Sequence, residues 1–102
     1  MVKIGAEQFE HYVNNPDPDE AFRTAQDEAF YDHGHSGYSG TIAEKPSYQI
    51  ITDDVFTASE ANTYMDTVQD HPIVDDKWGP AAAIRVADDK RDGWLFFGWA
   101  SS

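Results

Sequence analysis

The sequence predicts a single α+β domain that spans residues 1–102, with an antiparallel sheet and two helices on one face of it. Two segments have apolar residues at helical spacing and begin with capping sequences, and strand-like segments flank both of them. A polar hairpin turn separates the last two strands. Placing both helices on one face, in a ferredoxin-like fold or a near variant, is the simplest way to bury every apolar stripe.

The first segment, residues 2–13, has the composition of a strand whose apolar residues change parity partway along. This change predicts either a bulge near Glu7-Gln8 or a strand that is buried on both faces. Asp17 and Pro18 then predict a helix start, because aspartate caps well and proline suits the first helical position. The helix is expected over about 18–33, with an apolar stripe formed by Phe22, Ala25, Ala29, Phe30 and His33.

The second half of the chain predicts further strands and a second helix. Residues 41–43 and 48–52 form either a hairpin or one strand that is entered through a bend. The sequence Thr57-Ala58-Ser59-Glu60 is a capping box that begins a helix, and Pro72 ends it. Residues 81–86 and 94–99 are the last two strands, so the expected order is β-α-β-(β)-α-β-β.

The charge of the chain is strongly negative. Thirteen aspartates and six glutamates face four lysines and three arginines, which gives a net charge of −12. Such a charge destabilises a compact state through self-repulsion, so the composition predicts adaptation to a cytoplasm with molar salt. The acidic residues form short pairs rather than one tail, which favours a solvated surface over a mimic of nucleic acid. A basic stripe that could bind nucleic acid is missing from the sequence.

Composition also excludes several kinds of site. The chain has no cysteine, which excludes disulfides, thiolate metal sites and a cysteine nucleophile. The sequence contains neither a signal-like apolar segment at its start nor about 20 consecutive apolar residues, so we expect a cytoplasmic protein that does not bind membranes.

The densest group of residues suited to chemistry lies in the segment that follows the first helix. Glycine lets a backbone approach a ligand, and polar side chains fix the ligand's orientation. The expected ligand-binding residues are His33, His35, Ser36, Gly37, Tyr38, Ser39, Gly40 and Thr41. The alternative is a structural role, in which the glycines serve turns and His33 is partly buried at the helix end.

Two kinds of ligand suit this segment. His33 and His35 with Asp32 could begin a metal site, with His11 or His71 as a further ligand supplied by the fold. A phosphate or nucleotide is the other candidate, although the glycines follow a helix and meet the negative end of its dipole. The sequence requires no cofactor. Nor does it contain the GxSxG motif of a serine hydrolase, so a non-enzymatic function is favoured over catalysis by Ser36 or Ser39.

The last strand predicts an interface. Trp94, Phe96, Phe97 and Trp99 place aromatic rings on both parities. A sheet with helices on one face leaves the other face open, and an exposed aromatic patch normally marks an interface. These four residues are therefore expected to form a homodimer interface, unless the strand is central and covered by other segments.

The run from His33 to Lys45, HGHSGYSGTIAEK, resembles part of a family of small uncharacterised proteins of phages and prokaryotes, including haloarchaea. Those proteins have an acidic, alanine-rich helix followed by a GY[ST]GTIAEK-like stretch. The later segments 76–81 (DKWGPA) and 96–102 (FFGWASS) are similar to the C-terminal pattern of the family. The resemblance covers most of the chain and implies no activity. We therefore expect a small interaction protein, with a metal- or nucleotide-binding loop as the alternative.

Overall fold

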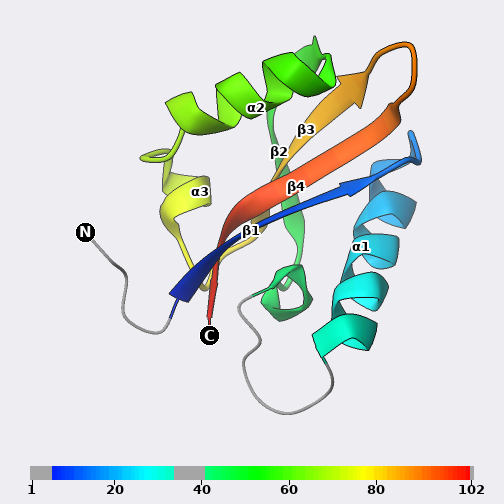
Figure 1. Ribbon diagram of the computed structural model, residues 1–102. Coiled ribbons are helices and arrows are strands. Elements are labelled where there is room, and N and C mark those ends of the chain that lie inside the picture. Colours follow the sequence, from blue (N-terminus) through cyan, green and yellow to red (C-terminus); the bar gives the residue numbers. More distant parts are fainter. Residues whose placement is uncertain (1–5, 34–40, 102) are drawn as a thin grey trace.

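The computed structural model describes residues 6–33 and 41–101 (Figure 1). In this part of the chain, helices separate the first three strands, and the last two strands follow one another directly. In order, the elements are β1 (Ala6–Val13), α1 (Pro18–His33), the 3₁₀ helix η1 (Ile42–Glu44), β2 (Tyr48–Phe56), α2 (Ala58–Thr67), α3 (Pro72–Asp75), β3 (Ala81–Ala87) and β4 (Asp92–Ser101).

The strands form one sheet in the order β1-β4-β3-β2. β4 pairs antiparallel with both β1 and β3, whereas β2 pairs parallel with β3. The α+β class expected from the sequence is confirmed, and the topology is compatible with a variant of the ferredoxin-like fold. The sheet is mixed rather than wholly antiparallel, because α2 and α3 form a crossover between the parallel strands β2 and β3.

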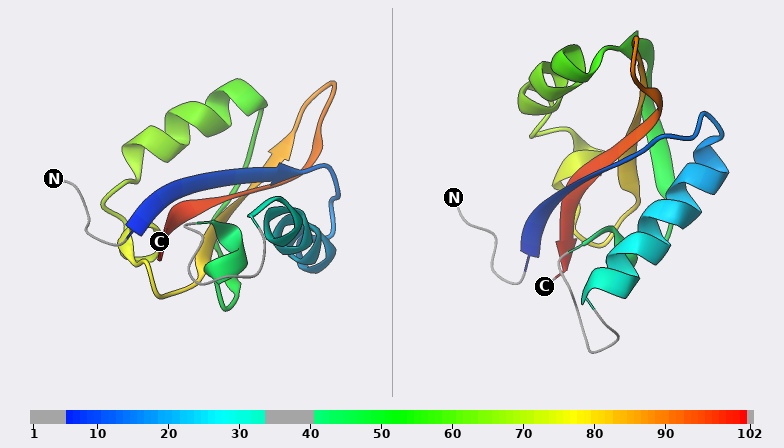
Figure 2. Two further views of the ribbon diagram at one scale, coloured as in Figure 1. Left: turned by 60° about the horizontal axis from the view of Figure 1, so that its bottom comes forward. Right: turned by 45° about the vertical axis from the view of Figure 1, so that its right-hand side comes forward.

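The helices lie on opposite faces of the sheet, and the expectation of two helices on one face is wrong (Figure 2). Successive residues of a strand point to opposite faces. On β4, Trp94 and Phe96 pack in the core beneath α1, whereas Leu95 and Phe97 pack in the core beneath α2 and α3. A strand that is apolar on both faces needs cover on both, and the two helical layers provide it.

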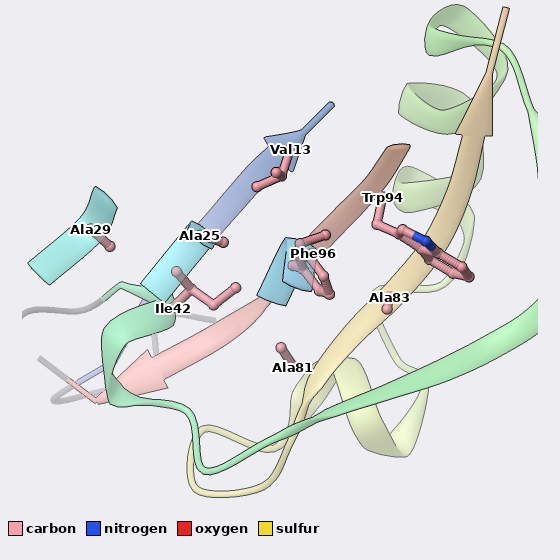
Figure 3. Close-up of a cluster of buried hydrophobic side chains, with 9 residues drawn as sticks. Val13, Ala25, Ala29, Ile42, Ala81, Ala83, Trp94 and Phe96 are labelled. Carbon is pink, nitrogen blue, oxygen red and sulfur yellow. The ribbon is translucent and has the colours of Figure 1, made fainter. Parts of the chain in front are cut away.

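Small residues bring α1 close to the sheet. Its three fully or almost fully buried side chains are alanines, and two alanines of β3 lie in the same core (Figure 3). Large side chains from β4 and η1 fill the space between them, with Phe96 and Ile42 at 0% and 1% exposed. Phe30, expected on the buried stripe, is 47% exposed instead. The alanines of α1 in this core are Ala21, Ala25 and Ala29.

Caps fix the helix starts that the sequence predicts. The Asp17 carboxylate accepts hydrogen bonds from the backbone N–H groups of Asp19, at 2.9 Å, and Glu20, at 3.3 Å. Thr57 and Glu60 form the expected capping box at the start of α2. Both caps satisfy backbone donors that a helix end leaves unpaired.

Three local expectations differ from the structure. Residues 42–44, within the segment expected as a strand, form the 3₁₀ helix η1, because Thr41 caps it and Ile42 is buried against α1. α3 was not expected; His71 caps it, accepting at Nδ1 from the N–H of Ile73. β1 pairs with β4 without interruption from Ala6 to Val13, so there is no bulge at Glu7-Gln8.

Gly93 provides a test of the close approach between β4 and the end of β1. A Cβ atom at this position would lie 1.9 Å from the carbonyl oxygen of Val13, so the backbone must shift to admit it. We expect Gly93→Ala to lower the free energy of unfolding by about 1–3 kcal/mol, measured by urea denaturation. In the control Gly79→Ala, the Cβ meets a side-chain oxygen of Asp76, which can move away. Equal free energies of unfolding for the two variants would contradict the close approach of Gly93 to the backbone of Val13.

Candidate functional site

The glycine- and histidine-rich segment expected to bind a ligand lies almost wholly outside the described residues. Residues 34–40, and the side chains of Asp32 and His33, fall in this group. Thr41 is described, and its hydroxyl accepts a 3.3 Å hydrogen bond from the N–H of Ala43 at the start of η1. The ligand and metal sites proposed for this segment therefore stay predictions.

The two other histidines considered as metal ligands have structural partners. His11 Nε2 lies 2.9 Å from a carboxylate oxygen of Glu28, which links β1 to α1. The Nδ1 atom of His71 caps α3. Within the part of the chain that the structure describes, no group of three or more His, Asp or Glu side chains is placed to hold a metal ion. The same ranges contain no helix that is long and apolar enough to cross a membrane.

Three of the four aromatic residues expected at a dimer interface lie in the protein's own core. Phe96, Phe97 and Trp94 are 0%, 2% and 8% exposed, and Trp99 is half-buried. The open sheet face on which that interface depended does not exist, because helices cover both faces. β4 is instead the covered central strand that the alternative described. The burial of Trp94, Phe96 and Phe97 leaves them no surface to offer a second copy, and the homodimer itself stays a prediction.

The described residues form a groove between β1 and α2, with a volume of about 420 Å³. β4 forms its floor where Phe97 and Gly98 lie, and Met65 of α2 adds a further apolar contact. Gly98 has a φ of +142°, a conformation that side-chain-bearing residues rarely adopt. A Cβ atom here would also lie 3.3 Å from the carbonyl oxygen of Val74, so glycine permits β4 to approach α3 closely. The groove has the size of a small-molecule pocket, which is typically about 300–1,000 Å³.

Polar side chains line the rim of this groove. Gln8 of β1 donates from Nε2 to Oε1 of Gln69, which follows α2, and Gln69 donates to the carbonyl of Met65 at 2.9 Å. This pair of amides ties the two walls together. Glu10 on β1 and Asp66 on α2 add an exposed carboxylate to each wall. An apolar floor between two carboxylates suits a ligand with an aliphatic stem and a cationic head.

Lys45 is the buried charge that sequence reasoning missed. Its side chain is 3% exposed, and its Nζ donates a 2.8 Å hydrogen bond to the carbonyl of Asp76. The ammonium also lies 5.8 Å from the centre of the Phe9 ring, within cation–π range. Burial lowers the pKa of Lys45 from 10.5 to about 8, and the charge of Asp76 opposes this shift.

Lys45 joins segments that are distant in the sequence. Through Asp76 it connects the end of η1 to the chain that follows α3, and through Phe9 it contacts β1. Gln26 of α1 holds the same turn, donating from Nε2 to the carbonyl of Lys45 at 2.7 Å. This arrangement fixes the end of η1 against the core. The scarcity of lysine in so acidic a chain is the one sequence signal that could have singled out Lys45.

Comparison of the chain with family models, with curated proteins and with solved structures gave no match. The resemblance to small phage and prokaryotic proteins therefore stays a prediction.

The pKa of Lys45 predicts a pH dependence of stability. Between about pH 8 and pH 10 the unfolded chain holds the lysine proton and the folded chain releases it, so stability rises with pH. We expect a gain of about 2 kcal/mol across this window, measured by denaturation at fixed salt. Tyr48 limits the window from above, because burial and its hydrogen bond to Asp19 raise its pKa to about 12.

Lys45→Met is the control for this prediction. Methionine keeps an apolar side chain of similar length in the same space but cannot titrate. The rise in stability between pH 8 and pH 10 should disappear in this variant. A rise that persists in Lys45→Met would assign the effect to other groups.

Proposed function

We propose that this chain is a small non-enzymatic binding protein, adapted to high salt, that holds a cationic side chain of a partner protein in the groove between β1 and α2. The observation behind the proposal is the groove itself, in which an apolar floor lies between Glu10 and Asp66. A lysine or arginine of a partner has the matching form, since its aliphatic stem can pack against the partly buried Met65 while its head meets the carboxylates.

The use of the basic residues supports the adaptation to salt. Lys45 is buried, Arg85 pairs with Asp92, and Arg91 lies 3.7 Å from Asp88. Two arginines thus pair with neighbouring aspartates and one lysine is buried, while most aspartates and glutamates of the described surface are exposed. A net charge of −12 then gives a field that attracts cationic partners and that salt must screen for the fold to be stable.

The first prediction of this proposal concerns stability in salt. The free energy of unfolding should rise steadily as KCl is raised from about 0.15 M to 1 M, because the Debye length falls from about 8 Å to 3 Å. Urea denaturation at each KCl concentration measures the effect. The double variant Asp53→Asn/Asp54→Asn, which removes two exposed charges from β2, should show a weaker dependence. A stability that stays constant or falls with KCl would contradict the adaptation.

The second prediction concerns the groove. Acetyl-arginine amide should shift the amide NMR signals of β1, α2 and residues 97–98, whereas the neutral isostere acetyl-citrulline amide should not. We expect Glu10→Gln/Asp66→Asn to weaken this binding about tenfold or more, because each carboxylate can make a charge-assisted hydrogen bond to the guanidinium.

The Asp53→Asn/Asp54→Asn variant is the matched control, because it makes the same change in net charge away from the groove. It should keep nearly all of the affinity. Equal weakening in both variants would show that the probe responds only to net charge, and equal shifts from citrulline would exclude recognition of a cation.

A further inference from the structure

We propose that the free edge of β1 pairs with β1 of a second copy, antiparallel and with Phe9 opposite the partner's Phe9, so that the two grooves become one. This inference rests on the proposed binding role of the groove for its functional meaning, but the pairing itself is argued from the strands. It gives the homodimer expected from the sequence a surface that the buried aromatic residues cannot provide.

The sheet has two edge strands, and they differ in their suitability for pairing. β2 carries exposed Asp53 and Asp54, and its register with β3 shifts between Ile50 and Val55. A bulge of this kind is a device that protects an edge from another strand. β1 also carries two exposed acids, Glu7 and Glu10, but it runs without a register shift for eight residues and contains neither proline nor lysine. β1 is therefore the edge that remains open to a partner.

Symmetry limits how two copies of β1 can pair. A two-fold axis that relates antiparallel strands in one continuous sheet is perpendicular to that sheet, so each face of one copy continues into the same face of the other. Residues directly opposite one another share a face. Neighbouring residues of a strand point to opposite faces, so two opposite residues must be separated by an even number of positions in the sequence. In every such register, one residue lies on the two-fold axis and faces the same residue of the other copy.

Charge selects one of these registers. Centring on Phe9 places Glu7 opposite the partner's His11 and aligns residues 6–12 of both copies. Centring on Glu10 instead places two glutamates face to face on the axis, which is destabilising. Centring on Gln8 pairs only residues 6–10 of the described strand. The Phe9 register thus combines the longest overlap with complementary side chains.

The same register completes the groove. It sets Gln8 opposite the partner's Glu10, on the face that carries α2, and the two-fold axis repeats this pair. Gln8 and Glu10 line the groove and belong to an edge strand, so the second copy adds an amide and a carboxylate beside each groove. The result is one trough between the two α2 helices, with a carboxylate from each β1 along its floor.

Cysteine cross-linking tests the register, and the chain has no cysteine of its own. Disulfide formation is followed by intact mass in about 1 M KCl, where repulsion between copies of charge −12 is screened. A mixture of Glu7→Cys and His11→Cys chains should cross-link rapidly, because these positions are opposite in the Phe9 register. Each variant alone should cross-link slowly. Rapid cross-linking of Gln8→Cys alone or of Glu10→Cys alone would overturn the register, and absence of any cross-link would overturn the pairing.

A charge exchange gives a second test that does not need cysteine. His11→Glu places two acids opposite each other twice across the axis and should weaken dimerisation about tenfold, measured by sedimentation equilibrium. It also sets an acid beside Glu28 of the same chain, so the stability of each variant is measured by urea denaturation as well. Adding Glu7→Lys should restore the dimer, because lysine then faces the partner's glutamate. Thr63→Glu, on the exposed surface of α2, controls for the added charge. Failure of Glu7→Lys to restore dimerisation in a folded His11→Glu variant would contradict the pairing.

The outcomes separate this inference from the proposed function. Loss of arginine binding in Glu10→Gln/Asp66→Asn with an unchanged cross-linking pattern at positions 7 and 11 supports both. Cross-linking in the Phe9 register without arginine binding would retain the dimer and reject the ligand. A monomer that binds acetyl-arginine amide would retain the ligand and reject the dimer.

Discussion

The fold depends on β4, a central strand whose side chains must be covered on both faces. Phe96 and Phe97 point in opposite directions and are almost fully buried, so neither layer of helices can be removed without exposing a large ring. The volume of these rings leaves room only for small partners, which explains the alanines of β3 and α1. The long β4 also pairs with β1 and β3, so it orders both halves of the sheet.

The position of the charged residues follows from the burial of the aromatic rings in two cores, one on each face of the sheet. Because two helical layers enclose the aromatic rings, the outer surface is free to carry carboxylates, and repulsion among them is the cost. Lys45 is an exception, since it lies inside and contacts the Asp76 carbonyl and Phe9 at the end of the sheet. A buried ammonium is tolerated there because a carbonyl and an aromatic face replace part of its hydration.

The elements that local sequence controls could be predicted, and those that depend on tertiary packing could not. α1 begins at Pro18 and α2 at Ala58 because caps specify a helix start within a few residues. The side of the sheet on which a helix packs depends on the crossover between β2 and β3, which no single segment specifies. The groove is equally hidden, since Gln8 and Asp66 become neighbours only when β1 and α2 border β4. Nothing in the local sequence distinguishes Lys45 from an exposed lysine, because its burial depends on tertiary packing.

Binding in the groove and pairing of β1 must influence each other, because both use Gln8 and Glu10. In the paired form a bound cation would lie near carboxylates of two chains, and its charge would offset the repulsion that opposes dimerisation. Thermodynamic linkage makes this effect reciprocal. If a bound cation raises the dimerisation constant by some factor, dimerisation raises the affinity for the cation by the same factor. Screening by salt weakens the attraction to the cation but also removes the repulsion between copies. A strongly acidic chain can therefore remain separate in dilute buffer and assemble in molar salt or around a cationic partner.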